Sequence, residues 1–200
     1  SGLLHDVIED THFTVNDIEK KFGNDVSSIV NSLTKLTADE NTLIENLDQK
    51  NMRRFLVSVA KDVRVMIIKL ADRLHNVETL KYLDTEKRKK IAKETLSIHA
   101  PLAQKIGMND LKWRLEDESF KHLMPEKFKM TKRLISQKRS EREATTKNMI
   151  SEIELFLKDK NIIANVTGRP KSLFSVYNKL QRYKQMGRNF SDIEDLIAIR

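Results

Sequence analysis

Residues 63–83 constrain the fold most, because apolar side chains recur on two sides of the helix that they predict. One stripe advances in steps of three or four and contains Val63, Ile67, Leu70, Leu74 and Val77. A second stripe on nearly the opposite side contains Val65, Ile68, Asp72, Asn76 and Thr79. A helix with two apolar sides is usually central in its domain. Since an unpaired carboxylate is costly to bury, we expect Asp72 to meet a cation, a proton or hydrogen-bond donors.

The composition agrees with a helix-rich globular protein. Among 200 residues, 39% are hydrophobic and 33% charged, with five Gly and three Pro. The absence of Cys excludes disulfides, thiolate metal sites and cysteine nucleophiles. No segment reaches the roughly 20 apolar residues that cross a bilayer, so we expect a cytoplasmic protein without a membrane partner.

Helical patterns fill most of residues 1–119. Thr14 and Asp17 predict the start of a short capped helix that Gly23 ends. A helix is also predicted through Val26 and Leu33, and a loop over residues 37–46. Further helices are predicted over residues 48–61, 87–103 and 110–123.

The character of the chain changes after a charged helical stretch at residues 126–160. Strands are predicted over residues 162–166 and 196–199, with a turn at 167–170 and a helix at 171–183 between them. Residues 1–85 contain 11 basic and 14 acidic residues, whereas residues 86–200 contain 26 and 15. The acidic half suits cations and the basic half suits phosphates. The strand-turn-helix-strand order indicates that a second, α/β domain begins near residue 161.

Both ends of the sequence lead us to expect a piece of a longer protein. The chain begins with Ser1 and enters an apolar run at Leu3, and its last residues form an apolar strand pattern without a following turn.

The segment from His5 to Asp10 carries the strongest local chemical signal. On a helix, His5 and Glu9 would be four residues apart, as would Asp6 and Asp10. Like charges this close repel, and a divalent cation such as Mn²⁺, Fe²⁺ or Zn²⁺ would relieve the repulsion. The alternative interpretation is an exposed acidic helix start beside a capping His.

Two motif pairs together resemble one known family. The hydrolase motifs His5-Asp6-x-x-Glu9-Asp10 and Lys69-Leu-Ala-Asp72-Arg73-Leu-His-Asn76 resemble those of His-Asp metal-dependent phosphohydrolases, and more closely the Rel/Spo (p)ppGpp synthetase/hydrolases of the stringent response. The segments 168–179 and 195–200 resemble the opening of that family's synthetase domain. The resemblance covers essentially the whole chain.

The resemblance implies a mainly α fold with three parts. A helical HD hydrolase domain would occupy residues 1–119, a helical connector 120–160, and the start of an α/β nucleotidyltransferase-like synthetase domain 161–200. His5, Asp6 and Asp72 match Mn²⁺ ligands. Glu9 and Asp10 match the acidic pair that orients or activates water, and Asn76 and Thr79 match contacts to the guanosine nucleotide. The implied reaction hydrolyses (p)ppGpp to GDP or GTP and pyrophosphate.

In the synthetase half, the resemblance implies binding of ATP and Mg²⁺. Arg169 matches a residue that stacks on adenine, Lys171 and Lys179 match contacts to ATP phosphates, and Ser175 lies one turn before Lys179. Asp195 matches a Mg²⁺ ligand. The implied reaction transfers pyrophosphate from ATP to the 3′-hydroxyl of GDP or GTP. Any association with the ribosome would require regions beyond Arg200.

The family pattern also contains residues that this chain lacks. A first histidine ligand of the hydrolase site would precede Ser1, and a second Mg²⁺ carboxylate and a guanine-stacking Tyr would follow Arg200. We therefore expect this chain alone to be weak or inactive in both reactions.

Two other functions remain open from the residues. One is an HD-family phosphohydrolase for another nucleotide, and the other is a degenerate regulator that only binds nucleotide. Apart from the resemblance, Lys171 and Lys179 would be read as a solvated helix face. The remaining histidines are expected to be ordinary surface or capping residues: His12, His75, His99 and His122.

Overall fold

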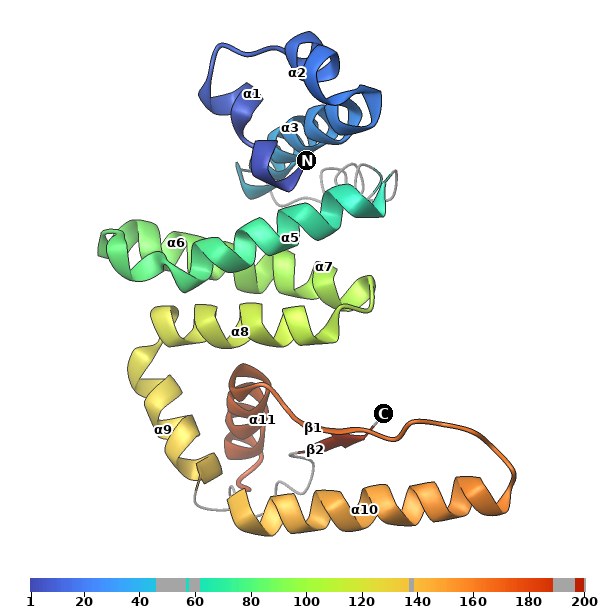
Figure 1. The fold of residues 1–200 in the computed structure, drawn as a ribbon. Coiled ribbons are helices and arrows are strands. Elements are labelled where there is room, and N and C mark those ends of the chain that lie inside the picture. The colour runs from blue at the N-terminus through green and yellow to red at the C-terminus, as the bar shows by residue number, and fades with distance from the viewer. Residues whose placement is uncertain (46–56, 58–61, 137–138, 189–196, 200) are drawn as a thin grey trace. The chain divides into compact units, whose positions relative to one another are not determined.

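The computed structural model describes residues 1–45, 57, 62–136, 139–188 and 197–199 (Figure 1). The chain divides into two compact units, Ser1–Asn76 and Val77–Arg200. Helices dominate the described part of both units. Across these ranges, no helix combines the length and apolar character that crossing a bilayer requires.

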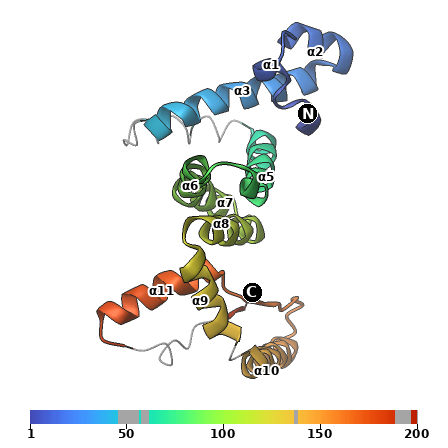
Figure 2. The same ribbon diagram turned by 90° about the vertical axis from the view of Figure 1, so that its left-hand side faces the viewer.

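The first unit is built from short helices and two longer ones. Its elements are η1 (Gly2–Leu4), α1 (Val7–Asp10), α2 (Val15–Phe22), α3 (Asn24–Glu45) and α5 (Val63–Glu78) as far as Asn76. Helices α1 and α2 both pack on α3, and α2 and α3 lie side by side in Figures 1 and 2. Buried apolar residues from α2, α3 and α5 include Ile18, Val30, Leu33, Leu36, Met66 and Leu70.

The boundaries of α2 confirm the prediction from its caps. The Thr14 hydroxyl accepts from the Asp17 amide at 3.3 Å, and the Thr14 amide donates to Asp17 Oδ2 at 2.9 Å. Gly23 ends the helix with a φ of 84°, a left-handed conformation that glycine adopts without strain. The local capping pattern therefore marks both ends of this helix.

The predicted loop over residues 37–46 is wrong for its described part, because α3 continues to Glu45. Buried side chains at Leu36 and Glu40 continue the packed face of the helix through this polar stretch. The helix predicted over residues 48–61 lies almost entirely outside the described residues and stays a prediction.

Helix α5 is less symmetric than its two stripes predict. Val63 and Ile67 are 56% and 41% exposed, so the beginning of the first stripe is not buried. Val65 and Met66 are buried instead. The helix ends at Glu78, and Thr79 precedes the short helix η2 (Leu80–Tyr82) rather than extending α5.

The second unit begins with helices that confirm most of the predicted pattern. Helix α6 (Thr85–Glu94) leads through the π-helical turn η3 (Thr95–His99) into α7 (Ala100–Lys105), and α8 (Asn109–Leu123) packs back on α6 and α7 (Figure 2). Pro101 lies in the first turn of α7 and does not end the helical run. The preceding π-helical turn accommodates its missing N–H group.

The charged stretch at residues 126–160 forms two helices, α9 (Pro125–Ser136) and α10 (Arg139–Asp159). An aromatic cluster packs α8 and α9 against α11 (Leu173–Gln185). The fully buried Phe120 ring of α8 lies 5.7 Å from Phe128 of α9, measured between ring centroids. It also lies 5.5 Å from Phe174 and 4.9 Å from Tyr177 of α11.

The predicted strand over residues 162–166 and turn over 167–170 are wrong in position. The strand is β1 (Gly168–Pro170), which pairs antiparallel with β2 (Ile197–Ile199) and aligns Arg169 with Ala198. Ile162 and Ile163 are exposed, whereas Gly168 approaches α10 so closely that a Cβ would collide with the Thr146 side chain. The predicted strand at 196–199 and helix at 171–183 are confirmed within a few residues. The three domain boundaries stay a prediction.

Candidate metal centre and nucleotide pocket

In the first unit, the side chains of His5, Asp6 and Asp72 converge. His5 and Asp6 occupy the turn between η1 and α1, and Asp72 lies on α5. His5 Nε2 lies 2.9 Å from Asp6 Oδ2 and 3.3 Å from Asp72 Oδ1. Asp6 holds the N-cap position of α1 but makes no capping hydrogen bond, so its carboxylate lies beside His5 instead.

The tautomer of His5 follows from its other ring nitrogen. Nδ1 lies 2.7 Å from the Gly2 carbonyl oxygen and must donate a proton to it, because a carbonyl only accepts. In the neutral ring, Nε2 therefore presents a lone pair to two carboxylates. Nε2 is buried and makes no hydrogen bond of acceptable geometry with the described residues, although both oxygens are close. A cation between these groups would be coordinated by the imidazole nitrogen and by carboxylate oxygens.

Asp72 is held by contacts from its own helix and its neighbours. Asn76 Nδ2 donates to both carboxylate oxygens of Asp72 at 3.2 Å. Lys69 and Arg73, which precede and follow Asp72 on α5, form ion pairs with the buried Glu40 of α3 at 3.5 Å and 2.5 Å. These pairs fix α5 against α3 and so fix the position of Asp72.

The donors fit a divalent transition metal in kind, since imidazole nitrogen and carboxylate oxygen are both suitable ligands. The Nδ1 hydrogen bond to a carbonyl is also the contact that orients metal-binding histidines. Within the described ranges, however, no group of three or more His, Asp or Glu side chains has the arrangement of a complete metal site. The structure thus brings His5, Asp6 and Asp72 together as two pairs that share His5.

Three further residues are predicted for this site. Glu9 and Asp10 are exposed on α1, where both amides bond to the Asp6 carbonyl oxygen at 3.0 and 2.9 Å. Thr79 is half-buried before η2 and belongs to the second unit. The roles of these three residues stay predictions.

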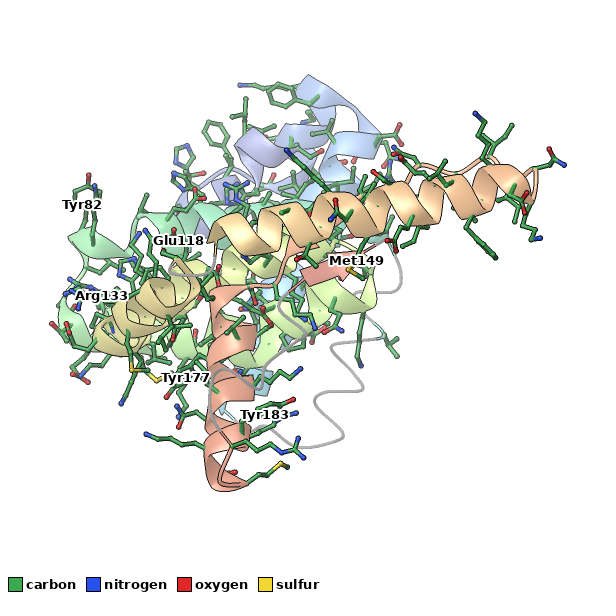
Figure 3. The ribbon with its side chains drawn as sticks, turned by 90° about the horizontal axis from the view of Figure 1, so that it is seen from below. Tyr82, Glu118, Arg133, Met149, Tyr177 and Tyr183 are labelled. Atoms are coloured by element: carbon green, nitrogen blue, oxygen red, sulfur yellow. The ribbon has the colours of Figure 1, made fainter. Side chains whose placement is uncertain are left out.

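In the second unit, α8 and α11 line a cavity of about 660 Å³. Three residues predicted to bind nucleotide lie on it: Lys171, Ser175 and Lys179. The Lys179 Nζ atom lies 5.5 Å from the centroid of the Tyr183 ring, which projects from the last part of α11 (Figure 3). The remaining lining residues are Asn109, Lys112, Trp113, Glu116, Ser172, Asn178, Arg182, Tyr183 and Met186.

The lining of this cavity is strongly basic. Lys112 and Arg182 add to the predicted Lys171 and Lys179, and among the lining residues that the structure describes, Glu116 is the one acidic side chain. Positive charge in a concave site attracts anions and raises their local concentration. The cavity therefore has the charge that a nucleotide phosphate requires.

Adjacent carboxylates of α8 contact the first turn of α11. Ser172, the N-cap of α11, donates from its hydroxyl to Glu116 Oε2 at 2.5 Å. Asp117 accepts from the Phe174 amide at 3.1 Å and from Trp113 Nε1 at 2.7 Å. Burial raises the pKa of Asp117 above its ordinary value of 3.8, and the hydrogen bonds from α11 and Trp113 oppose that shift.

Sequence reasoning missed the contribution of α8 to this cavity. Lys112, Trp113 and Glu116 belong to no motif, and only the four-residue spacing of Lys112 and Glu116 marks them as one helix face. Of the other predicted residues, Arg169 lies in β1 with only its backbone described, and Asp195 lies outside the described residues.

The sequence is similar to one family model and to several known proteins. The sequence model of the HD domain family matches residues 1–109. A GTP pyrophosphokinase from Streptomyces coelicolor is 42% identical over 200 residues, which are all of this chain and 23% of that protein. A guanosine-3′,5′-bis(diphosphate) 3′-pyrophosphohydrolase from Spiroplasma citri is 38% identical over 203 residues, and the bifunctional (p)ppGpp synthase/hydrolase SpoT from Escherichia coli is 38% identical over 200. These matches cover all of this chain and 26% and 28% of those proteins. The chain spans about a quarter of the length of these curated relatives.

Proposed function

The chain belongs to the Rel/Spo family of (p)ppGpp synthetases and hydrolases, and from this premise we propose that it is part of an enzyme that both degrades and makes (p)ppGpp. In this proposal, residues 1–119 form the HD hydrolase domain, 120–160 a helical connector, and 161–200 the start of the synthetase domain.

The hydrolase proposal is carried by the convergence of His5, Asp6 and Asp72. These residues would hold a Mn²⁺ ion, which, when bound, lowers the pKa of a water ligand and so favours the hydroxide form of the nucleophile. Asn76 would keep the Asp72 carboxylate oriented through the hydrogen bonds at 3.2 Å. Glu9 or Asp10 would accept the proton of the attacking water.

In the reaction, the oxygen of water attacks the phosphorus that is bonded to the 3′-oxygen of (p)ppGpp. The bond between this phosphorus and the 3′-oxygen breaks, and the 3′-oxygen takes up a proton. The products are pyrophosphate and GDP or GTP. Asn76 and Thr79 would contact the guanosine part of the substrate.

The synthetase proposal is supported by the basic cavity between α8 and α11. Lys171, Ser175 and Lys179 would bind the ATP phosphates, Arg169 would stack on adenine, and Asp195 would bind Mg²⁺. The 3′-hydroxyl of GDP or GTP attacks the β-phosphorus of ATP, and AMP leaves. Catalysis of this kind depends on positioning and on neutralising phosphate charge.

Replacing Asp72 with Asn in the full-length protein tests the hydrolase assignment. We expect Mn²⁺-dependent release of pyrophosphate from ppGpp to fall by at least about 100-fold, because a ligand is lost, while synthesis from ATP and GDP is retained. Asp62→Asn is the matched control, since Asp62 lies at the start of the same helix and pairs with Arg64. Hydrolysis at an unchanged rate in Asp72→Asn would contradict the assignment.

An HD phosphohydrolase for another nucleotide, with an unrelated second domain, is disfavoured by the comparisons. The relatives align with all 200 residues, including the segment from Gly168 to Lys179. A degenerate regulator would bind ppGpp without turnover, which calorimetry beside the same activity measurement would distinguish.

A further inference from the structure

We propose that Glu116 of α8 is a positioning residue for the nucleotide cavity, because its carboxylate fixes the first turn of α11 from which the phosphate-binding side chains project. The inference rests on the proposed function of that cavity as an ATP site.

The contacts of Glu116 join segments that are far apart in the sequence. Its Oε2 atom accepts from Ser172 Oγ at 2.5 Å and from Ser175 Oγ at 3.3 Å. Ser172 is 4% exposed and caps α11, because its Oγ accepts from the Ser175 amide at 3.2 Å. One carboxylate therefore contacts both hydroxyls at the start of α11.

The position of Glu116 is electrostatically unusual for a cavity that binds phosphate. Glu116 is 9% exposed, and its other oxygen lies 3.6 Å from Lys112 Nζ. A carboxylate there repels an anionic ligand and reduces the effect of Lys112. Its hydrogen bonds with Ser172 and Ser175 can outweigh this repulsion, because they hold the cavity in its binding conformation.

The proposed phosphate-binding residues are close in sequence to the serines that Glu116 contacts. Lys171 directly precedes the N-cap, Ser175 lies in the first turn of α11, and Lys179 follows one turn later. Asp117 adds a second contact by accepting from the Phe174 amide at 3.1 Å. Loosening the Glu116 contacts should therefore displace Lys171 and Ser175 together.

The test is calorimetric binding of α,β-methylene ATP with Mg²⁺ to the full-length protein, because this analogue resists pyrophosphate transfer. We expect Glu116→Ala to raise the Kd by at least about tenfold, since hydrogen bonds to a charged acceptor are lost. Glu116→Gln should stay within about threefold of the unmodified protein, because its carbonyl oxygen still accepts from the serine hydroxyls. If Glu116 acted only by repelling phosphate, both variants would bind more tightly.

Controls separate positioning from general loss of structure. Glu118 lies on the same helix, and its carboxylate pairs with Lys121 at 2.9 Å. Glu118→Gln should therefore leave the Kd unchanged. Ser172→Ala should weaken binding on its own, and its effect should be less than additive with that of Glu116→Ala, because the two substitutions share the Ser172–Glu116 hydrogen bond although Ser172→Ala also removes the N-cap. Ser172→Ala also tests the contact if Glu116→Ala fails to fold.

The outcomes distinguish this inference from the function on which it rests. No binding by the unmodified protein overturns the ATP assignment of the cavity, and this inference with it. Binding by the unmodified protein with an equal or lower Kd in Glu116→Ala, or additive effects of the two substitutions, overturns the positioning role alone.

Discussion

Trp113 and Asp117 form a single hydrogen bond that can report on the cavity. Trp113 is the only tryptophan of the chain and lies on the cavity wall. Its Nε1 atom donates to Asp117 Oδ2 at 2.7 Å, and burial raises the pKa of Asp117. Ionisation of one half-buried carboxyl should thus alter the emission of one indole.

We expect Trp113 fluorescence of the chain to change with pH at a midpoint above 3.8, the ordinary pKa of Asp. Because the pKa is raised in the folded state, the stabilising contribution of protonated Asp117 is present below 3.8 and is lost as pH rises through the raised pKa. A fluorescence titration measures the transition, and Asp117→Asn should abolish it. A midpoint at or below 3.8 would contradict the effect of burial.

At the residue scale, motifs predicted the chemistry but not the geometry of the candidate sites. His5 and Asp72 could be selected from sequence because both stand in distinctive local patterns. The bond from His5 Nδ1 to the Gly2 carbonyl, which determines the tautomer, depends on a turn that no pattern predicts. Glu116 could not be selected, since its partners lie 56 and 59 residues away.

At the scale of elements, the pairing of α3 with α5 depends on a buried charge cluster. Glu40 is 2% exposed and contacts Arg73 and Lys69 of α5. Lys69 also donates to Thr37 Oγ1 at 3.0 Å. These long-range contacts explain why a polar stretch that predicts a loop is helical.

Replacing Glu40 with Ala should lower the free energy of unfolding by about 3 kcal/mol, because the buried carboxylate that pairs with Arg73 and Lys69 is lost. Urea unfolding measures the change. Lys35→Ala on the same helix is exposed and should change stability by less than about 0.5 kcal/mol. An equally small effect of Glu40→Ala would show that the cluster does not stabilise the pairing.

Elements whose signals are local were predicted best. Helix α2 depends on Thr14, Asp17 and Gly23, all within the segment itself. Strand β1 depends on pairing with β2, almost 30 residues later, so the local composition of residues 162–166 predicted the wrong position.

At the scale of the whole molecule, the proposed Mn²⁺ ligands and the proposed ATP contacts lie in different units. The His5 cluster belongs to Ser1–Asn76, and the basic cavity belongs to Val77–Arg200. Substitutions in one site should therefore affect one reaction first.

We expect Lys179→Ala in the full-length protein to raise the KM for ATP in synthesis by at least about tenfold, because a phosphate contact is lost. Hydrolysis of ppGpp should be retained. Lys184→Ala removes an exposed lysine of the same helix outside the cavity lining and serves as the control. Equal KM values for Lys179→Ala and Lys184→Ala would remove Lys179 from the ATP site.

The most direct test of the account is a Mn²⁺ titration of the full-length protein followed by electron paramagnetic resonance. His5→Gln and Asp72→Asn should each weaken Mn²⁺ binding at the hydrolase site by at least about tenfold, whereas Asp62→Asn should not. If both variants bind Mn²⁺ as tightly as the unmodified protein, His5 and Asp72 do not share an ion, and the hydrolase proposal fails.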